Sequence, residues 1–232
     1  MENDAKLKYN QQGVLRIVGT PIGNLMDLSP RGIEAFQKTD FIVCEDTRVT
    51  KRLAKLRDFS IKTLTSLNDF NETRKLTSIV DKIKQGNDVI LTCDAGMPLV
   101  SDPGYKLVSK CIENKIQIDV IPGPSAIISA LVVSGLAPNN FFFGGFPPKK
   151  KKRRIDSLKK LLEIDATLIW FESPKRVLSF LSDLLSIFGN RQTVIAKELT
   201  KLYQEILRND LKSIICELKK RKVLKGEYVI LL

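Results

Sequence analysis

The sequence has no histidine among its 232 residues. Without an imidazole, the common zinc and haem ligand sets, the Ser-His-Asp triad and a histidine general base are excluded. The four cysteines (Cys44, Cys93, Cys111 and Cys216) form no C-x-x-C pair. We therefore expect them to be small buried apolar groups in a reducing compartment, and we predict no metal site.

Long apolar runs and targeting signals are also missing. The chain contains no stretch of about 18 apolar residues, the length needed to cross a membrane. Its first residues, M-E-N-D, lack the pattern of a secretory signal. We therefore predict a cytoplasmic protein that binds no membrane. The glycine-rich fingerprints G-x-x-x-x-G-K-[ST] and G-x-G-x-x-G are absent too, so neither a nucleoside triphosphate nor NAD is expected.

What the chain does have is positive charge in its second half. Its net charge is +12; residues 1–120 hold 18 basic and 16 acidic side chains, and residues 121–232 hold 20 and 10. Six consecutive cations follow a Pro-Pro pair, where we expect a flexible surface loop. Such a run is typical of a solvated loop or of a polyanion contact, with nucleic acid as the obvious candidate. These six residues are Lys149, Lys150, Lys151, Lys152, Arg153 and Arg154.

Apolar runs alternate with amphipathic stretches along the whole chain. In the first half we predict strands at residues 15–19, 41–45, 61–65, 88–93 and 117–121, with helices between them, which favours a parallel sheet. In the second half we predict strands at 141–145, 166–171, 193–197, 203–207 and 228–232, with helices near 125–134, 155–163, 174–188 and 211–221. A possible hairpin there favours a mixed sheet. We predict two α/β domains, residues 1–122 and 123–232.

Glycine, proline and polar residues cluster just past the predicted strands. In open α/β sheets, ligands bind at the edge where the carboxyl ends of the strands lie, so loops brought to one such edge would form a site. Three of these regions also contain a possible N-cap residue followed by proline, which predicts a helix start. These pairs are Ser29-Pro30, Asp102-Pro103 and Ser173-Pro174.

Seven motifs fall in or near these loops. They are V-G-T-P-I-G-N-L at 18–25, C-E-D-T-R at 44–48, D-A-G-M-P-L-V-S-D-P-G at 94–104, P-G-P-S-A at 122–126, F-E-S-P-K-R at 171–176, K-E-L-T-K at 197–201 and K-G-E at 225–227. In this order they resemble the tetrapyrrole methylase family of S-adenosylmethionine-dependent enzymes, from about residue 14 to the last residue. The E-D-T-R and D-A-G-x-P-L motifs are highly specific for it.

The resemblance implies a tetrapyrrole methylase-like fold of two α/β domains with a cofactor cleft between them. It also implies S-adenosyl-L-methionine as cofactor, with the methionine part held by backbone groups of the 94–104 loop and the adenosine nearer residues of the second half. An apolar slot for adenine fits Phe171. The implied cofactor-binding residues are Pro21, Asp94, Gly96, Leu99, Val100, Ser101, Ser125, Ala126, Phe171, Lys225, Gly226 and Glu227.

Within the family, the E-D-T-R loop and the cation run favour an RNA substrate. The resemblance implies 2′-O-methylation of a cytidine ribose in the decoding region of small-subunit ribosomal RNA, by a homodimer acting on the small ribosomal subunit. The predicted substrate contacts are Arg48, the six cations, Lys175 and Arg176. With histidine absent, the candidates for taking up the hydroxyl proton are Asp46, Glu172, Lys197 and Glu198. The alternative roles for these residues are an ion-pair partner or a surface charge.

Two departures from the family pattern keep alternatives open. Relatives tend to carry histidine in the segment that corresponds to residues 67–72, where this chain has Asn68, and they usually continue past the K-G-E strand. The alternatives are a carbon methylase of a tetrapyrrole precursor, a non-catalytic RNA-binding module, and a basic α/β protein that binds neither RNA nor cofactor. Binding of S-adenosylmethionine and a coloured porphyrinoid product are the observations that separate them.

Overall fold

The computed structural model describes residues 12–68 and 70–232. The chain divides into two compact units, Met1–Pro124 and Ser125–Leu232. The domain boundary predicted after Pro122 lies close to this division. The cofactor cleft that was expected between the two domains stays a prediction.

The first unit contains a five-stranded sheet in the order β3-β2-β4-β1-β5, and every pairing in it is parallel. The parallel sheet predicted from alternating strands and helices is confirmed. A parallel arrangement places the carboxyl ends of all five strands at one edge. The strands are β1 (Leu15–Val18), β2 (Phe41–Cys44), β3 (Thr63–Ser66), β4 (Val89–Leu91) and β5 (Ile118–Ile121).

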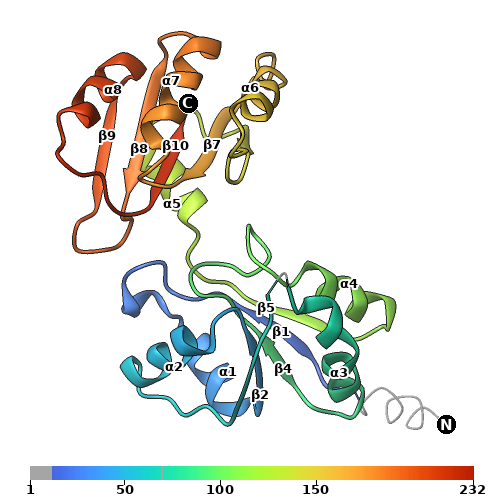
Figure 1. Cartoon of the computed structure of the whole chain (residues 1–232). Coiled ribbons are helices and arrows are strands. Elements are labelled where there is room, and N and C mark those ends of the chain that lie inside the picture. Colours follow the sequence, from blue (N-terminus) through green and yellow to red (C-terminus); the bar gives the residue numbers. More distant parts are fainter. Residues whose placement is uncertain (1–11, 69) are drawn as a thin grey trace. The chain divides into compact units, whose positions relative to one another are not determined.

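Helices cover both faces of this sheet (Figure 1). Helices α1 (Pro30–Lys38) and α2 (Thr47–Leu56) pack on one side, in a cluster that includes Phe36 and Ile90. Helices α3 (Glu72–Lys84) and α4 (Tyr105–Glu113) pack on the other, with Leu91. Burial on both faces explains why the strands are almost continuously apolar. A 3₁₀ turn, η1 (Leu25–Asp27), precedes α1.

The second unit contains a mixed sheet in the order β6-β7-β10-β8-β9, as predicted. Only the β6–β7 pairing is parallel, and the other three are antiparallel. The last apolar strand lies at the centre of the sheet, and the strand expected at 203–207 runs further, to Asp210. The strands are β6 (Phe141–Phe143), β7 (Thr167–Glu172), β8 (Gln192–Lys197), β9 (Glu205–Asp210) and β10 (Tyr228–Leu231).

Four helices belong to the second unit. Helices α6 (Lys151–Lys159), α7 (Val177–Phe188) and α8 (Leu211–Lys219) contribute to one apolar core with β7, β8 and β10. Helix α5 (Ala126–Ser134) contacts β8, β9 and β10. Among the described residues, no helix combines the length and the apolar character needed to cross a membrane.

Three local predictions are wrong. The flexible loop expected at residues 149–154 is largely helix, because α6 begins at Lys151 and lysine and arginine are good helix formers. The Asp102-Pro103 and Ser173-Pro174 pairs start no helix, since α4 begins at Tyr105 and α7 at Val177. The Ser173 hydroxyl instead donates to Glu172 Oε1 at 3.3 Å. Only the pair at 29–30 acts as predicted, with the Ser29 hydroxyl oxygen capping α1.

Candidate functional site

Loops meet at the carboxyl edge of the first unit's sheet. Gly19 follows β1 and Gly123 follows β5, and a Cβ atom on Gly19 would lie only 2.7 Å from the Cα of Gly123. Since real Cβ atoms do not approach that closely, the two backbones pass each other only because both positions lack a side chain. These two loops are therefore in direct backbone contact.

The loop after β4 joins the same edge. Gly96 and Thr20 exchange two backbone hydrogen bonds, of 2.9 and 3.1 Å. The Thr20 hydroxyl also donates to the Cys93 carbonyl at 3.2 Å, and the Gly123 N–H lies 3.2 Å from the Met97 sulfur. Three loops are thus bonded to one another, and they carry the predicted cofactor residues of the first unit.

Two residues of the loop after β4 have strained backbones. Leu99 and Ser101 have φ angles of +73° and +71°, in the left-handed region that L-residues other than glycine rarely adopt. Strain of this kind costs on the order of 1–3 kcal/mol per residue and clusters at functional sites. Val100 between them is 44% exposed. Left-handed residues can turn successive backbone N–H groups toward one side of a loop, an arrangement that binds anions such as a carboxylate.

The E-D-T-R loop contacts this region through Asp46. Its N–H donates to Asp94 Oδ1 at 3.0 Å, while its carboxylate caps α2 through the Arg48 N–H at 2.8 Å and pairs with the Arg48 guanidinium at 2.6 Å. Hydrogen bonds from Arg48 lower the pKa of Asp46 to about 2. Burial raises the pKa of Asp94. A carboxylate with so low a pKa is a weak base at neutral pH, but it stays ionised and can hold a hydrogen-bond donor.

In the second unit, a polar row crosses the sheet at one level. Tyr228 of β10 lies opposite Glu172 of β7 on one side and Lys197 of β8 on the other, and Lys197 lies opposite Glu205 of β9. Directly opposite residues in antiparallel strands share a face, so the register gathers these four side chains. Lys197 Nζ lies 3.4 Å from Glu205 Oε2, and burial raises the pKa of Tyr228.

Glu172 does not fit the role of proton acceptor that the sequence suggested. Its side chain is 0% exposed, and Oε1 accepts from the Ser173 N–H at 2.7 Å and pairs with the Arg176 guanidinium at 2.7 Å. A group that takes a proton from a substrate must reach it, and this carboxylate is enclosed. The contacts of Glu172 therefore favour a supporting role, and its catalytic role stays a prediction.

Glu198 holds the K-G-E segment. Its Oε1 accepts from the Glu227 N–H at 2.9 Å and from Lys201 Nζ at 3.0 Å. Burial acts to raise the pKa of Glu198, but these two donors together lower it. Gly226 has a φ of +91°, and a Cβ there would lie 2.7 Å from Glu198 Cγ. The structure therefore joins a predicted catalytic residue to predicted cofactor residues, and the contacts of Glu198 are those of a structural support.

The remaining predicted cofactor residues of the second unit lie at element ends. Ser125 caps α5 by accepting from the Ile128 N–H at 3.4 Å, and Ala126 begins that helix. Phe171 is half-buried in β7, with its ring 4.9 Å from that of Phe143 and 5.5 Å from that of Phe146. These rings form an apolar surface beside the strand.

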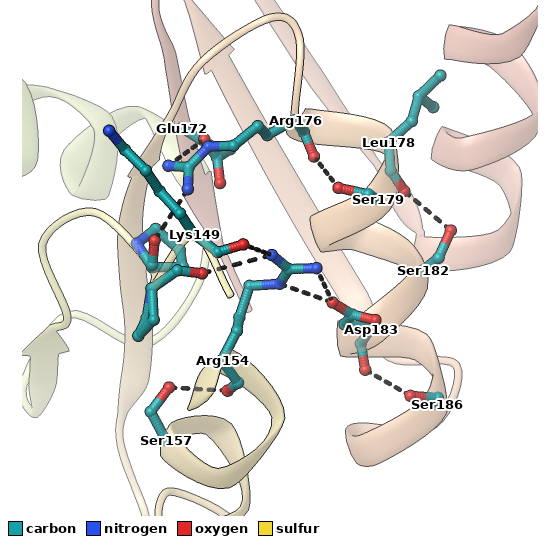
Figure 2. A network of polar contacts seen from close by, with 12 residues as sticks. Lys149, Arg154, Ser157, Glu172, Arg176, Leu178, Ser179, Ser182, Asp183 and Ser186 are labelled. Carbon is teal, nitrogen blue, oxygen red and sulfur yellow. Dashed lines mark hydrogen bonds and ion pairs between the residues drawn. The ribbon is translucent and has the colours of Figure 1, made fainter. Parts of the chain in front are cut away.

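The cation run is divided between solvent and core, and its last residue, Arg154, points toward Asp183 (Figure 2). Lys149, Lys150, Lys151, Lys152 and Arg153 are exposed. Arg154 is only 5% exposed and pairs with Asp183 of α7, from Nη2 to Oδ2 at 2.6 Å. Arg154 therefore does not face solvent as the other five cations do, and its charge is balanced by a buried acid. This pairing disfavours the predicted substrate contact of Arg154. The sequence signal that could have revealed Asp183 is its lone charge within a strongly apolar helix.

The two other predicted substrate contacts near this run, Lys175 and Arg176, also divide into one exposed and one paired residue. Lys175 is exposed, whereas the Arg176 guanidinium is bound by Glu172 and donates to the Pro147 carbonyl at 3.1 Å. Arg176 thereby joins the segment at 171–176 to the segment that carries the lysines. The structure brings together two regions that the sequence assigned to RNA contact.

This fold occurs in known methyltransferases. A crystal structure of diphthine synthase matches with a TM-score of 0.70 at 15% identity, covering 95% of this chain and 89% of that one. Residues 14–215 match the model of the tetrapyrrole (corrin/porphyrin) methylases. The chain belongs to this family, which confirms the predicted fold and the prediction of an S-adenosylmethionine-dependent methyltransferase.

Two relatives are similar over nearly their whole lengths. A Thermotoga maritima protein named ribosomal RNA small subunit methyltransferase I is 44% identical over 221 residues, which is 95% of this chain and 98% of that protein. A Hydrogenobaculum protein of the same name is 42% identical, with 94% of each chain covered.

Proposed function

We propose that this protein transfers a methyl group from S-adenosylmethionine to the ribose 2′-hydroxyl of a cytidine in the decoding region of small-subunit ribosomal RNA. The observation that carries the proposal is the 44% identity to a relative named for small-subunit rRNA methylation, over almost the full length of both chains. The cationic surface at residues 149–153 supports a polyanionic substrate.

The described residues fit the cofactor. When bound, S-adenosylmethionine supplies an electrophilic methyl group on a sulfonium. The strained backbone at Leu99 and Ser101 would receive the methionine carboxylate, in an anion site of the kind described above. In the second unit, Phe171 offers an apolar surface for adenine, and Glu198 holds Gly226 and Glu227 in place for the adenosine.

The chain must also prepare the ribose hydroxyl, which is a weak nucleophile until its proton leaves. The Asp46 carboxylate is ionised at neutral pH, and Arg48 fixes its orientation. In the proposed mechanism it accepts a hydrogen bond from the hydroxyl and orients the oxygen toward the methyl group, which can contribute several kcal/mol through alignment. The hydroxyl proton leaves to water as the oxygen–carbon bond forms and the carbon–sulfur bond breaks, and Asp46 stays ionised. A catalytic role for Lys197, which pairs with Glu205, stays a prediction.

The test is transfer of a labelled methyl group to purified small ribosomal subunits, followed by mapping of the modified nucleotide. We expect one 2′-O-methylated cytidine in the decoding region. Methylation of a tetrapyrrole precursor to a coloured product, with no label in RNA, would favour the carbon methylase alternative. Binding of the subunits without measurable binding of S-adenosylmethionine would favour a non-catalytic RNA-binding module.

Three finer features are part of the proposal. We expect the assembled small subunit to be a better substrate than naked rRNA, because the decoding region is structured in the particle. We also expect a homodimer, which sedimentation of the purified protein would detect, and a cytoplasmic location. The homodimer rests on the family resemblance, and the cytoplasmic location rests on the sequence features described above.

A further inference from the structure

The segment that carries the lysines is held by side chains at three consecutive carbonyl groups (Figure 2). Arg176 Nη1 donates to the Pro147 carbonyl at 3.1 Å. Arg154 Nη1 lies 3.4 Å from the Pro148 carbonyl and 3.3 Å from the Lys149 carbonyl, and donates to both. Residues 144–150 belong to no helix or strand, so these guanidinium contacts supply hydrogen bonds that regular structure does not.

Each of these two arginines is itself anchored by a buried carboxylate. Arg154 donates from Nε and Nη2 to Asp183 Oδ2 at 2.7 and 2.6 Å, and both side chains are less than a tenth exposed. Arg176 donates to Glu172, whose side chain is fully buried. The carbonyls at 147–149 are thereby tied to α7 through Asp183 and to β7 through Glu172.

Stability alone gives a weak reason for this arrangement. The desolvation cost of a buried ion pair commonly cancels its attraction, and apolar replacements of similar size are often neutral or stabilising. Buried pairs are best known for specifying a particular arrangement. Here the arrangement that they specify is the path of the chain immediately before the exposed cations.

The cations at 149–153 also lie where positive charge destabilises a helix. Helix α6 begins with Lys151, Lys152 and Arg153, and its N-cap, Lys150, makes no side-chain cap hydrogen bond. Positive charge at a helix N-terminus opposes the helix dipole. Within the described part of the chain, no salt bridge engages Lys149 or these four residues. Five cations are therefore presented to solvent, without an internal partner, from a segment whose backbone is held.

We propose that Arg154 with Asp183, and Arg176 with Glu172, are positioning residues that hold the cations at 149–153 in a fixed arrangement for the backbone phosphates of the substrate RNA. This inference rests on the proposed function. Holding the segment in advance lowers the entropy lost on binding, so it favours substrate affinity over the chemical step. Since Arg154 and Asp183 are buried and pair with each other, their removal should change KM and leave kcat in place.

The test compares two double variants that keep the net charge and all five exposed cations. Arg154→Met with Asp183→Leu removes the buried pair and leaves an apolar contact of similar size. Glu34→Gln with Lys38→Gln removes an exposed pair on α1 and is the matched control. We expect the first variant to raise KM for purified small ribosomal subunits about tenfold, with unchanged kcat and unchanged S-adenosylmethionine affinity. Hydrogen exchange at residues 149–153 should become faster, and the control should match the wild type.

Two results would contradict the proposed positioning role. Faster exchange with an unchanged KM would show that the held segment is irrelevant to the substrate, and unchanged exchange would show that the arginines do not hold it. If the double variant fails to fold, Arg154→Lys carries the same test, because lysine can keep the ion pair but has no second nitrogen for the carbonyls. Wild-type protein that methylates no subunits would overturn the proposed function, and this inference with it.

Discussion

Gly226 is required both by its backbone conformation and by its close contact with Glu198. Its φ of +91° is in the region that favours glycine, and the Glu198 side chain occupies the space that a Cβ atom would need. The same carboxylate accepts the Glu227 N–H. The K-G-E motif therefore needs a glycine at position 226, because Glu198 holds the backbone there and leaves no room for a Cβ atom.

We expect Gly226→Ala to destabilise the protein by about 3 kcal/mol, because left-handed strain adds to a collision with Glu198. Gly135→Ala is the matched control, since Gly135 has a φ of +77° with nothing within 4 Å of its Cβ position, and strain alone predicts about 1–2 kcal/mol. Denaturant unfolding measures both values. Equal costs at the two positions would contradict the collision, and the cost at Gly226 should fall in a Glu198→Ala background.

Helix α2 illustrates how an element carries a functional group. Asp46 is its N-cap, the capping carboxylate pairs with Arg48, and the Asp46 N–H donates to Asp94 in the loop after β4. The cap accounts for an acidic residue at this position without any catalytic role. The question for Asp46 is therefore whether its charge, rather than its capping oxygen, is needed for activity.

Asp46→Asn separates these two roles, because asparagine caps a helix as well as aspartate does. We expect turnover to fall at least about tenfold, with S-adenosylmethionine affinity within about twofold of the wild type. Because Arg48 depresses the folded-state pKa of Asp46 from 3.8 to about 2, any stability that the charge adds is complete above about pH 4 and is lost as the pH falls toward 2.

Asp210→Asn is the control for this experiment. Asp210 caps α8 in the same way, by accepting from the Ser213 N–H, and hydrogen bonds from Ser213 lower its pKa. This variant should retain wild-type turnover. Full activity of the Asp46→Asn variant would remove that residue from the mechanism and leave it as a cap only.

At the scale of the whole molecule, the uneven charge is the main feature. The half of the sequence from residue 121 carries a net charge of +10 out of +12, and much of it is displayed at residues 149–153. Neutralising RNA phosphates releases counterions, which makes affinity fall steeply with salt. The charge distribution thus predicts a salt-dependent KM for the ribosomal substrate.

We expect Lys149→Gln with Lys150→Gln to weaken binding of small subunits and to reduce the slope of log affinity against log salt by about 1.5, since each phosphate contact contributes about 0.7–0.9. Lys219→Gln with Lys220→Gln, at the end of α8, lowers the net charge equally. An equal change of slope in both variants would show that net charge, and not this surface, governs binding. Equilibrium binding at several salt concentrations measures the slopes.

Much of the architecture could be predicted from local pattern. The alternation of apolar runs with amphipathic stretches located the ten strands found in residues 12–68 and 70–232, and the motifs at the strand ends indicated the family. Strand ends and helix starts were predicted less accurately. For example, Ser173 hydrogen-bonds to Glu172 and caps no helix. A competing side-chain partner of that kind has no signature in the spacing of residues.

The amino-acid sequence by itself determined the two α/β units, the family and the loops that form the candidate site, because periodicity and glycine-rich motifs are local properties of the chain. Only the tertiary structure decided which charged residues face solvent. Arg154 is one of six adjacent cations in the sequence, yet it is buried because α7 brings Asp183 against it. Glu172 is enclosed because Arg176 and the strand register surround it. Burial and pairing depend on contacts between distant segments, and these exist only once the chain has folded.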